Sequence, residues 1–167
     1  MIEGRGVISD IKGTGKKIEE LGGAYKSDYA FKDIIFFSEN GTLKVRVMTK
    51  KNWPTKDVIV IRKQSEFKEV GKIDSSLLRK EFDTEEEAVD FVKREFPEFK
   101  PELEYSRHGW QYELDGSRIF VEDIEFLGPS VEIEADSEED LKALFKKMGI
   151  DKILEESIPE AIKRIKK

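Results

Sequence analysis

Residues 130–135, Ser-Val-Glu-Ile-Glu-Ala, alternate strictly between polar and apolar side chains. In an extended strand, successive side chains point to opposite faces of the sheet. Val131 and Ile133 therefore share one face, and Glu132 and Glu134 share the other. Two glutamates on a solvated face would carry little information, but other segments place Arg or Lys, mixed with Glu, at the same alternate positions. This combination favours a sheet that closes on itself, with its polar side inside and its apolar side covered by helices.

Seven further segments have the composition of strands, and two pairs of them are joined by tight turns. Asn40-Gly41 and Asp115-Gly116 are dipeptides that favour short hairpin turns. The expected strands are residues 1–8, 31–37, 42–49, 58–63, 77–82, 102–111 or 102–114, and 117–124.

Four segments place apolar residues at the spacing of an amphipathic helix. Three of them begin with a capping pattern, because Thr84 is followed three residues later by Glu87, Ser137 by Asp140, and Ser157 by Glu160. The expected helices are residues 10–21, 84–96, 137–149 and 157–165.

The pattern of faces alone leaves two arrangements open. One is a barrel with a polar interior, and the other is an ordinary antiparallel sheet with a solvated polar face, on which cross-strand ion pairs contribute little. Alternation does not distinguish between them. Because no internal repeat, low-complexity tract or second core is visible, we predict a single domain over residues 1–167.

Composition excludes several classes of site. The chain has no cysteine, which excludes disulfides and thiol nucleophiles, and its single histidine, His108, excludes any site that needs two. A net charge of −6 argues against non-specific nucleic-acid binding. No apolar run is long enough to cross a membrane, and no signal-peptide pattern opens the chain. We therefore expect a cytoplasmic protein, monomeric or homodimeric, without nucleic-acid or membrane partners.

The charged residues at alternate strand positions form the candidate site. Arginine suits phosphate because its planar fork makes two parallel hydrogen bonds, and Mg²⁺ prefers carboxylate oxygens. Together these residue types suit a polyanion that is carried with a metal cation. The bases are Arg5, Lys44, Arg46, Arg62, Arg79, Arg107 and Arg118, and the acids are Glu3, Glu81, Glu122, Glu132 and Glu134.

The order of these motifs resembles the CYTH family, the triphosphate tunnel metalloenzymes, which include class IV adenylate cyclases and thiamine triphosphatases. The strongest match is residues 122–134, which are similar to the family pattern D-x-V-x-x-L-G-x-F-x-E-I-E. The other matching segments are Ile2-Glu3-Gly4-Arg5, Asp33-Ile34-Ile35-Phe36-Phe37, Leu43-Lys44-Val45-Arg46-Val47, Arg79-Lys80-Glu81, Arg107 with Trp110, and residues 157–162.

The resemblance implies an α+β fold: an antiparallel, mostly eight-stranded β-barrel, or triphosphate tunnel, with helices packed outside. It also implies a small-molecule triphosphate bound with Mg²⁺ or Mn²⁺. Carried over by residue, Glu3, Glu132 and Glu134 would hold the metal, and Glu3, Glu81 and Glu122 would serve catalysis. The phosphate-binding residues would be Arg5, Lys44, Arg46, Arg79, Arg107 and Arg118, with Arg62 from a weaker match.

Two departures from the family pattern concern catalysis more than binding. In the register that we favour, the first glutamate of the opening E-x-E-x-K motif falls on Met1; in the other register, Arg5 replaces a glutamate and Val7 replaces the lysine. The T-x-K strand lacks its threonine, appearing as either residues 60–62 or residues 61–63. The first hypothesis is a metal-dependent hydrolase acting on a nucleoside triphosphate, thiamine triphosphate or tripolyphosphate. The alternatives are an adenylate cyclase that forms cyclic AMP and pyrophosphate, a non-catalytic triphosphate sensor, and an ordinary helix-covered sheet protein with an unrelated partner.

Overall fold

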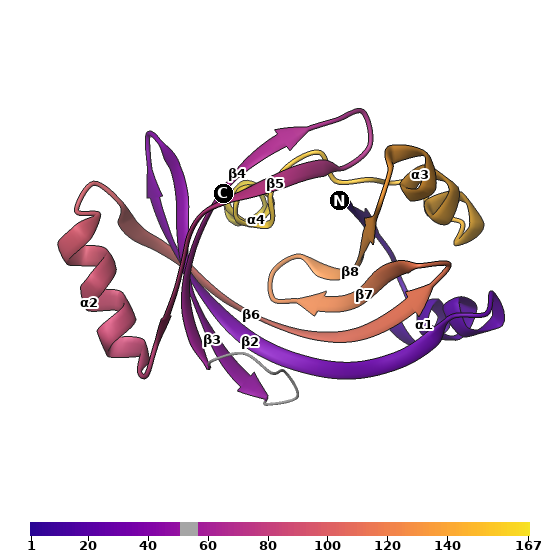
Figure 1. Ribbon diagram of the computed structural model, residues 1–167, viewed down its shortest axis with the longest axis horizontal. Helices are drawn as coiled ribbons and strands as arrows, with labels where there is room; N and C mark the ends of the chain where they lie inside the picture. The colour runs from indigo at the N-terminus through magenta and orange to yellow at the C-terminus, as the bar shows by residue number, and fades with distance from the viewer. Residues whose placement is uncertain (51–56) are drawn as a thin grey trace. The chain divides into compact units, whose positions relative to one another are not determined.

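The computed structural model describes residues 1–50 and 57–167, which form eight strands and four helices (Figure 1). In chain order these are β1 (Ile2–Val7), α1 (Ile11–Glu20), β2 (Ala24–Ser38), β3 (Gly41–Lys50), β4 (Val58–Phe67), β5 (Lys72–Phe82), α2 (Glu85–Glu95), β6 (Lys100–Leu114), β7 (Ser117–Ile124), β8 (Gly128–Ala135), α3 (Glu138–Lys147) and α4 (Ile158–Lys166).

The strands are hydrogen-bonded in the order β1-β5-β4-β3-β2-β6-β7-β8, and β8 pairs back to β1. The sheet is therefore a closed ring of antiparallel strands, which confirms the predicted α+β class and the eight strands. Every expected helix is present. Thr84 and Ser137 cap α2 and α3 as predicted, each accepting a hydrogen bond from a backbone N–H three residues later.

Three strands are longer than expected by about four residues or more. β2 begins at Ala24, whereas the sequence predicted residue 31; β4 runs on to Phe67, and β5 begins at Lys72. The added residues are mostly polar and exposed or half-exposed. They pair as strands although they lack an apolar face, and alternation therefore did not reveal them.

The chain divides into two compact units. Unit 1 comprises residues 1–28, 65–74 and 108–167, and unit 2 comprises residues 29–64 and 75–107. Strands β2, β4, β5 and β6 each contribute residues to both units.

Unit 1 has an apolar core between its strands and helices α1 and α3. The outward side chains of β7 and β8 pack with Leu141, Leu144 and Phe145 of α3. Helix α3 also lies closely against β1, because Gly4 and Gly6 present no side chain to it: a Cβ on Gly4 would stand 3.0 Å from the Phe145 ring. Ile119, Val121, Val131 and Ile133 are buried in this core, as the sequence predicted.

Unit 2 has a second core under α2. Ala88 and Val92 of α2 pack against Leu43 and Val45 of β3, with Val47 and Leu78 at the edge. The apolar side of these strands is therefore covered by a helix, as the sequence predicted. The side chains on the opposite faces of the same strands in both units are largely charged.

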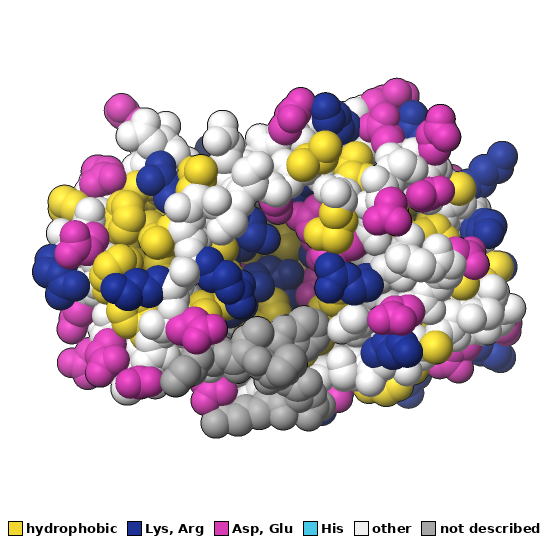
Figure 2. Space-filling view, viewed as in Figure 1, with side chains coloured by type: hydrophobic (Ala, Val, Ile, Leu, Met, Phe, Trp, Pro, Cys, Tyr) yellow, Lys and Arg dark blue, Asp and Glu magenta, His cyan; other side chains and the backbone are white. Residues whose placement is uncertain are grey.

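Two further observations concern the surface. Basic and acidic side chains are interspersed over the face shown in Figure 2, in keeping with a chain in which 40% of residues are charged. Within residues 1–50 and 57–167, no helix has the length and apolarity needed to span a bilayer.

Candidate functional site

Asp33 of β2 is the centre of a basic cluster in unit 2. It stands opposite Arg46 of β3 in the strand register, and it is fully buried. Arg46 donates from Nε and Nη2 to the two carboxylate oxygens at 2.9 and 3.0 Å, and Arg107 of β6 donates from Nη2 at 3.3 Å. Burial alone would raise the pKa of Asp33, but Arg46, Lys44 and Arg107 hold it well below its usual value. Asp33 therefore stays ionised and fixes both guanidinium groups.

Aromatic side chains support the same two arginines. The Arg46 guanidinium lies 3.9 Å from the centre of the Phe31 ring, and that of Arg107 lies 4.7 Å from it. The Tyr105 ring centre lies 5.9 Å from the Arg107 guanidinium, and burial raises the pKa of Tyr105 to about 12. Within the described residues its buried hydroxyl has no hydrogen-bond partner of good geometry. These contacts hold the guanidinium planes in fixed orientations.

Lys44 gives the cluster its excess of positive charge. Burial lowers the pKa of the Lys44 ammonium to about 7, and the positive charges of Arg46, Arg107 and Lys63 contribute to this shift against the opposing attraction of Asp33. Among the described residues, no carboxylate lies within ion-pair distance of it. We call Asp33, Lys44, Arg46 and Arg107 the cationic cluster. It holds three bases and one acid, so it is arranged for an anion.

The structure distinguishes Arg62 from Lys63 on β4. Ile59 and Ile61 stand opposite Arg46 and Lys44 in the register, so Lys63 shares their face. Arg62 lies on the other face, with its guanidinium 5.1 Å from the ring of Phe99 in the core under α2. Of the two matches to the T-x-K strand that the sequence allowed, the structure favours residues 61–63. Lys63, and not Arg62, is the base near the cationic cluster.

Arg79 and Glu81 lie on β5, on the face opposite to Leu78 and Phe82, which pack toward α2. Both charged side chains are exposed. Their predicted roles in phosphate binding and catalysis stay predictions.

The acids predicted to bind metal lie in unit 1, where strands β1, β7 and β8 align them in rows. Glu3 stands opposite Glu134, which stands opposite Arg118. Arg5 stands opposite Glu132 in the next row. The third row pairs Ser130 with Glu122.

Arg5 is buried among acids and a hydroxyl. Its Nη2 lies 2.8 Å from Glu122 and 3.5 Å from Glu132, and its Nη1 donates to the Ser130 hydroxyl at 2.8 Å. Glu122 is itself only 2% exposed. Arg5 therefore neutralises two of the predicted acids and organises them, whereas the sequence predicted that it binds phosphate.

The other two predicted metal ligands also have basic partners. Lys72 of β5 stands opposite Glu3, and its Nζ lies 3.5 Å from Glu3 and 3.4 Å from Asp74. Arg118 lies 3.0 Å from Glu134. We call Glu3, Asp74, Glu122, Glu132 and Glu134, with their bases Arg5, Lys72 and Arg118, the paired-acid network.

The pKa of the Glu3 carboxyl is raised by its surroundings. Burial raises its pKa to about 8, the negative charge of Glu132 and a hydrogen bond to Asp74 add to the rise, and Lys72 opposes it. At neutral pH the Glu3 carboxyl therefore keeps its proton for most of the time.

The paired-acid network does not fit a preformed magnesium centre. Glu3, Glu132 and Glu134 each lie within ion-pair distance of a base. Over the part of the chain that the structure describes, no group of three or more His, Asp or Glu side chains is disposed to hold a metal ion. The sequence prediction of Mg²⁺ or Mn²⁺ stays a prediction that this arrangement does not favour.

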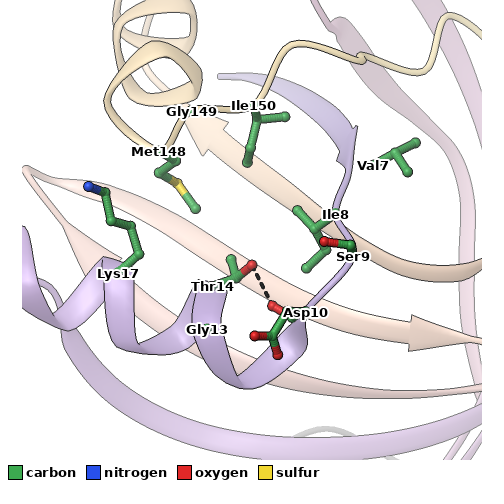
Figure 3. Close-up of a pocket in the computed structure, with 10 residues that line it drawn as sticks. All are labelled: Val7, Ile8, Ser9, Asp10, Gly13, Thr14, Lys17, Met148, Gly149 and Ile150. Atoms are coloured by element: carbon green, nitrogen blue, oxygen red, sulfur yellow. Dashed lines mark hydrogen bonds between the residues drawn. The ribbon is translucent and has the colours of Figure 1, made fainter.

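A separate cavity of about 440 Å³ lies in unit 1, between the end of β1, helix α1 and the end of α3 (Figure 3). Its lining includes Ile8, Met148 and Ile150, with Asp10 and Lys17 as the charged side chains, and it contains no predicted site residue. The Gly-Thr-Gly-Lys segment at residues 13–16 lies inside α1. It is therefore not a phosphate-binding loop.

Sequence reasoning missed Asp33, Lys63, Lys72 and Asp74 as site residues. Asp33 carried a usable signal, because it is the only charged residue on its face of an otherwise apolar stretch, between Phe31 and Ile35. Lys72 and Asp74 carried none, since the polar start of β5 was not recognised as a strand.

Comparison with solved structures shows which proteins share this fold. The PH1012 protein from Pyrococcus horikoshii has a TM-score of 0.76 and 19% identity, covering 95% of this chain and 97% of that one. HpAC1 from Hippeastrum, a proposed adenylyl cyclase with a dominant triphosphatase activity, has a TM-score of 0.69 and 15% identity, covering 98% and 95%. A proposed adenylate cyclase from Vibrio parahaemolyticus has a TM-score of 0.66 and 9% identity, covering 96% of each chain.

The fold is shared. These neighbours are consistent with the CYTH resemblance of the sequence motifs, and they confirm it at the level of the fold. No family model matches the sequence, and no curated protein matches it.

Proposed function

We propose that this protein binds a small-molecule triphosphate through the cationic cluster and hydrolyses it. The observation that carries the proposal is the excess of three bases over one acid around Asp33, in a partly buried setting where charge interactions are stronger than in water. The shared fold supports the same class of ligand, because one neighbour is described as having a dominant triphosphatase activity.

Each residue of the cationic cluster has a distinct part. Asp33 occupies the Nε and Nη2 edge of Arg46, so the Nη1 group is the part of that guanidinium positioned for a phosphate oxygen. Lys44 supplies a compact positive charge that no carboxylate of the described chain pairs with. These bases would neutralise the charge on the phosphate oxygens as the terminal phosphoryl group passes to water.

A second candidate is a sensor that binds a triphosphate without turnover. It is favoured by Met1 at the position of the first motif glutamate and by the ion pairs of the remaining acids. Both candidates require the same binding site and differ only in whether product forms.

Product analysis separates the candidates. The protein would be incubated with ATP, tripolyphosphate and thiamine triphosphate, with and without Mg²⁺, and orthophosphate, pyrophosphate and cyclic AMP would be measured. Orthophosphate release is the expected result, and cyclic AMP with pyrophosphate would indicate the cyclase alternative. Binding without any product would leave the sensor, and no binding of any of the three compounds would contradict the proposal.

A further inference from the structure

We propose that the paired-acid network of unit 1 holds no resident divalent cation, because its basic side chains occupy the carboxylates that a cation would need. The bases are Lys72, Arg5 and Arg118, and each belongs to a strand next to the acid with which it pairs. The inference concerns unit 1 alone and stands apart from the proposed function, except where tripolyphosphate is used as a probe.

The contacts between these bases and acids follow from the strand register. Lys72 is the cross-strand neighbour of Glu3, Arg5 of Glu132, and Arg118 of Glu134, and directly opposed side chains lie close enough to interact. Each predicted metal ligand is therefore given a base by the backbone pairing itself. Lys72 also reaches Asp74, so its ammonium lies between two carboxylates.

A divalent cation would have to displace these bases to reach its ligands. The contacts of the buried Arg5 include Glu122, Glu132 and Ser130, and moving it would remove a partner at 2.8 Å from the 2%-exposed Glu122. Breaking a buried pair is costly because it leaves an uncompensated charge. Met1 adds to this effect, because it stands where the family pattern has a glutamate, and this chain therefore lacks a further carboxylate that could share the ion.

Binding of Mn²⁺ alone provides the first test, measured on the full chain by electron paramagnetic resonance and by thermal shift. The wild-type protein is expected to leave Mn²⁺ free and to show the same melting temperature in millimolar MgCl₂ and in EDTA. A dissociation constant for Mn²⁺ below about 0.1 mM would overturn the inference.

Two variants test whether the bases are what excludes the ion. Lys72→Met should create affinity for Mn²⁺, with a gain of roughly tenfold or more, because Glu3 and Asp74 then lose the ammonium between them. Arg118→Gln removes the base that lies 3.0 Å from Glu134 and changes a side chain that is 48% exposed, so it keeps the test valid if the first variant does not fold. Lys142→Met, on the exposed surface of α3, is the matched control. Unchanged Mn²⁺ affinity in the folded variants would overturn the assignment of the bases.

Tripolyphosphate distinguishes this inference from the proposed function. The titration with tripolyphosphate is made in EDTA and in Mg²⁺, and because Mg²⁺ chelates tripolyphosphate in solution, a difference between the two conditions does not by itself report a cation site on the protein. Binding of tripolyphosphate, together with Mn²⁺ retained by the protein in its absence, would overturn the inference and leave the proposed function standing. Absence of binding in both conditions would contradict the proposed function, while the Mn²⁺ measurements would still decide the inference.

Discussion

Asp33 determines what the neighbouring bases can do. Its two oxygens are taken by Arg46 and Arg107, so it orients the guanidinium groups and leaves Lys44 without an acid of its own. A buried acid that fixes two bases is a positioning residue, and the anion would be bound by the charge that is left over. The low pKa of Asp33 shows that this arrangement holds the ionised form down to acidic pH.

The Lys44 ammonium links binding to pH. Its pKa is about 7 in the free protein, and a bound polyanion favours the charged form, so binding above pH 7 must take up a proton. We expect affinity for tripolyphosphate to fall with rising pH above 7, by up to about tenfold per pH unit. Calorimetry in buffers of different ionisation enthalpy would measure the proton uptake.

Lys44→Arg is the control for this prediction, because the arginine guanidinium keeps its positive charge over the whole pH range of the measurement. Tripolyphosphate itself takes up the same number of protons with either protein, so subtracting the proton uptake of the variant from that of wild type leaves the uptake due to Lys44. Equal proton uptake by the two proteins would show that Lys44 is not the group that titrates.

Glu3, in unit 1, links the stability of the protein to pH. Its folded-state pKa of about 8 lies above the ordinary 4.5, so the folded protein binds more protons between these values and loses stability as pH rises from 4.5 through 8. Glu3→Gln should therefore stabilise the protein at pH 8.5, by on the order of 1–3 kcal/mol, and change little at pH 4. Urea unfolding at the two pH values measures this, and a variant equally stable relative to wild type at both would contradict the raised pKa.

At the scale of the element, the sequence predicted a strand well where one face is apolar and poorly where both faces are polar. The strand at residues 117–124 was predicted with its observed bounds, because Ile119 and Val121 alternate with charged or aromatic neighbours over a helix-covered core. The start of β5 at Lys72 was missed, since residues 72–76 offer no apolar face. Two members of the paired-acid network, Lys72 and Asp74, were lost with it.

The glycines of β1 show how an element is fitted to its neighbour. A Cβ on Gly6 would collide with Ile150, whereas a Cβ on Gly4 would meet Phe145 and Leu141 at 3.0 and 3.1 Å. Gly6→Ala should therefore destabilise the protein by about 1–3 kcal/mol, and Gly4→Ala by less. Denaturant unfolding measures both, and Ile150→Ala added to Gly6→Ala should recover part of the loss. Greater destabilisation by Gly4→Ala would contradict the close approach at Gly6.

At the scale of the whole molecule, the order of motifs predicted more than any single motif. Each match to the CYTH pattern is loose, yet their sequence along 167 residues predicted an eight-stranded antiparallel sheet that neighbours at 9–19% identity share. The roles of individual bases were less predictable, because an arginine on a polar face gives the same sequence pattern whether it binds a phosphate or pairs with a neighbouring glutamate. Arg46 and Arg5 illustrate the two cases: one belongs to a cluster with excess positive charge, and the other is enclosed by acids.

The central claim is that a polyanion binds the cationic cluster, and the melting temperature with tripolyphosphate tests it most directly. At a ligand concentration of ~100 times Kd, linkage gives about 2.7 kcal/mol, or a rise of roughly 5–10 °C for a chain of this size. Lys44→Met should raise the melting temperature of the free protein at pH 6.5, because a desolvated charge is removed, and should reduce the rise with tripolyphosphate. Lys93→Met, an exposed base on α2, should match wild type in both. A melting temperature that tripolyphosphate leaves unmoved, or raises equally in wild type and Lys44→Met, would contradict the account.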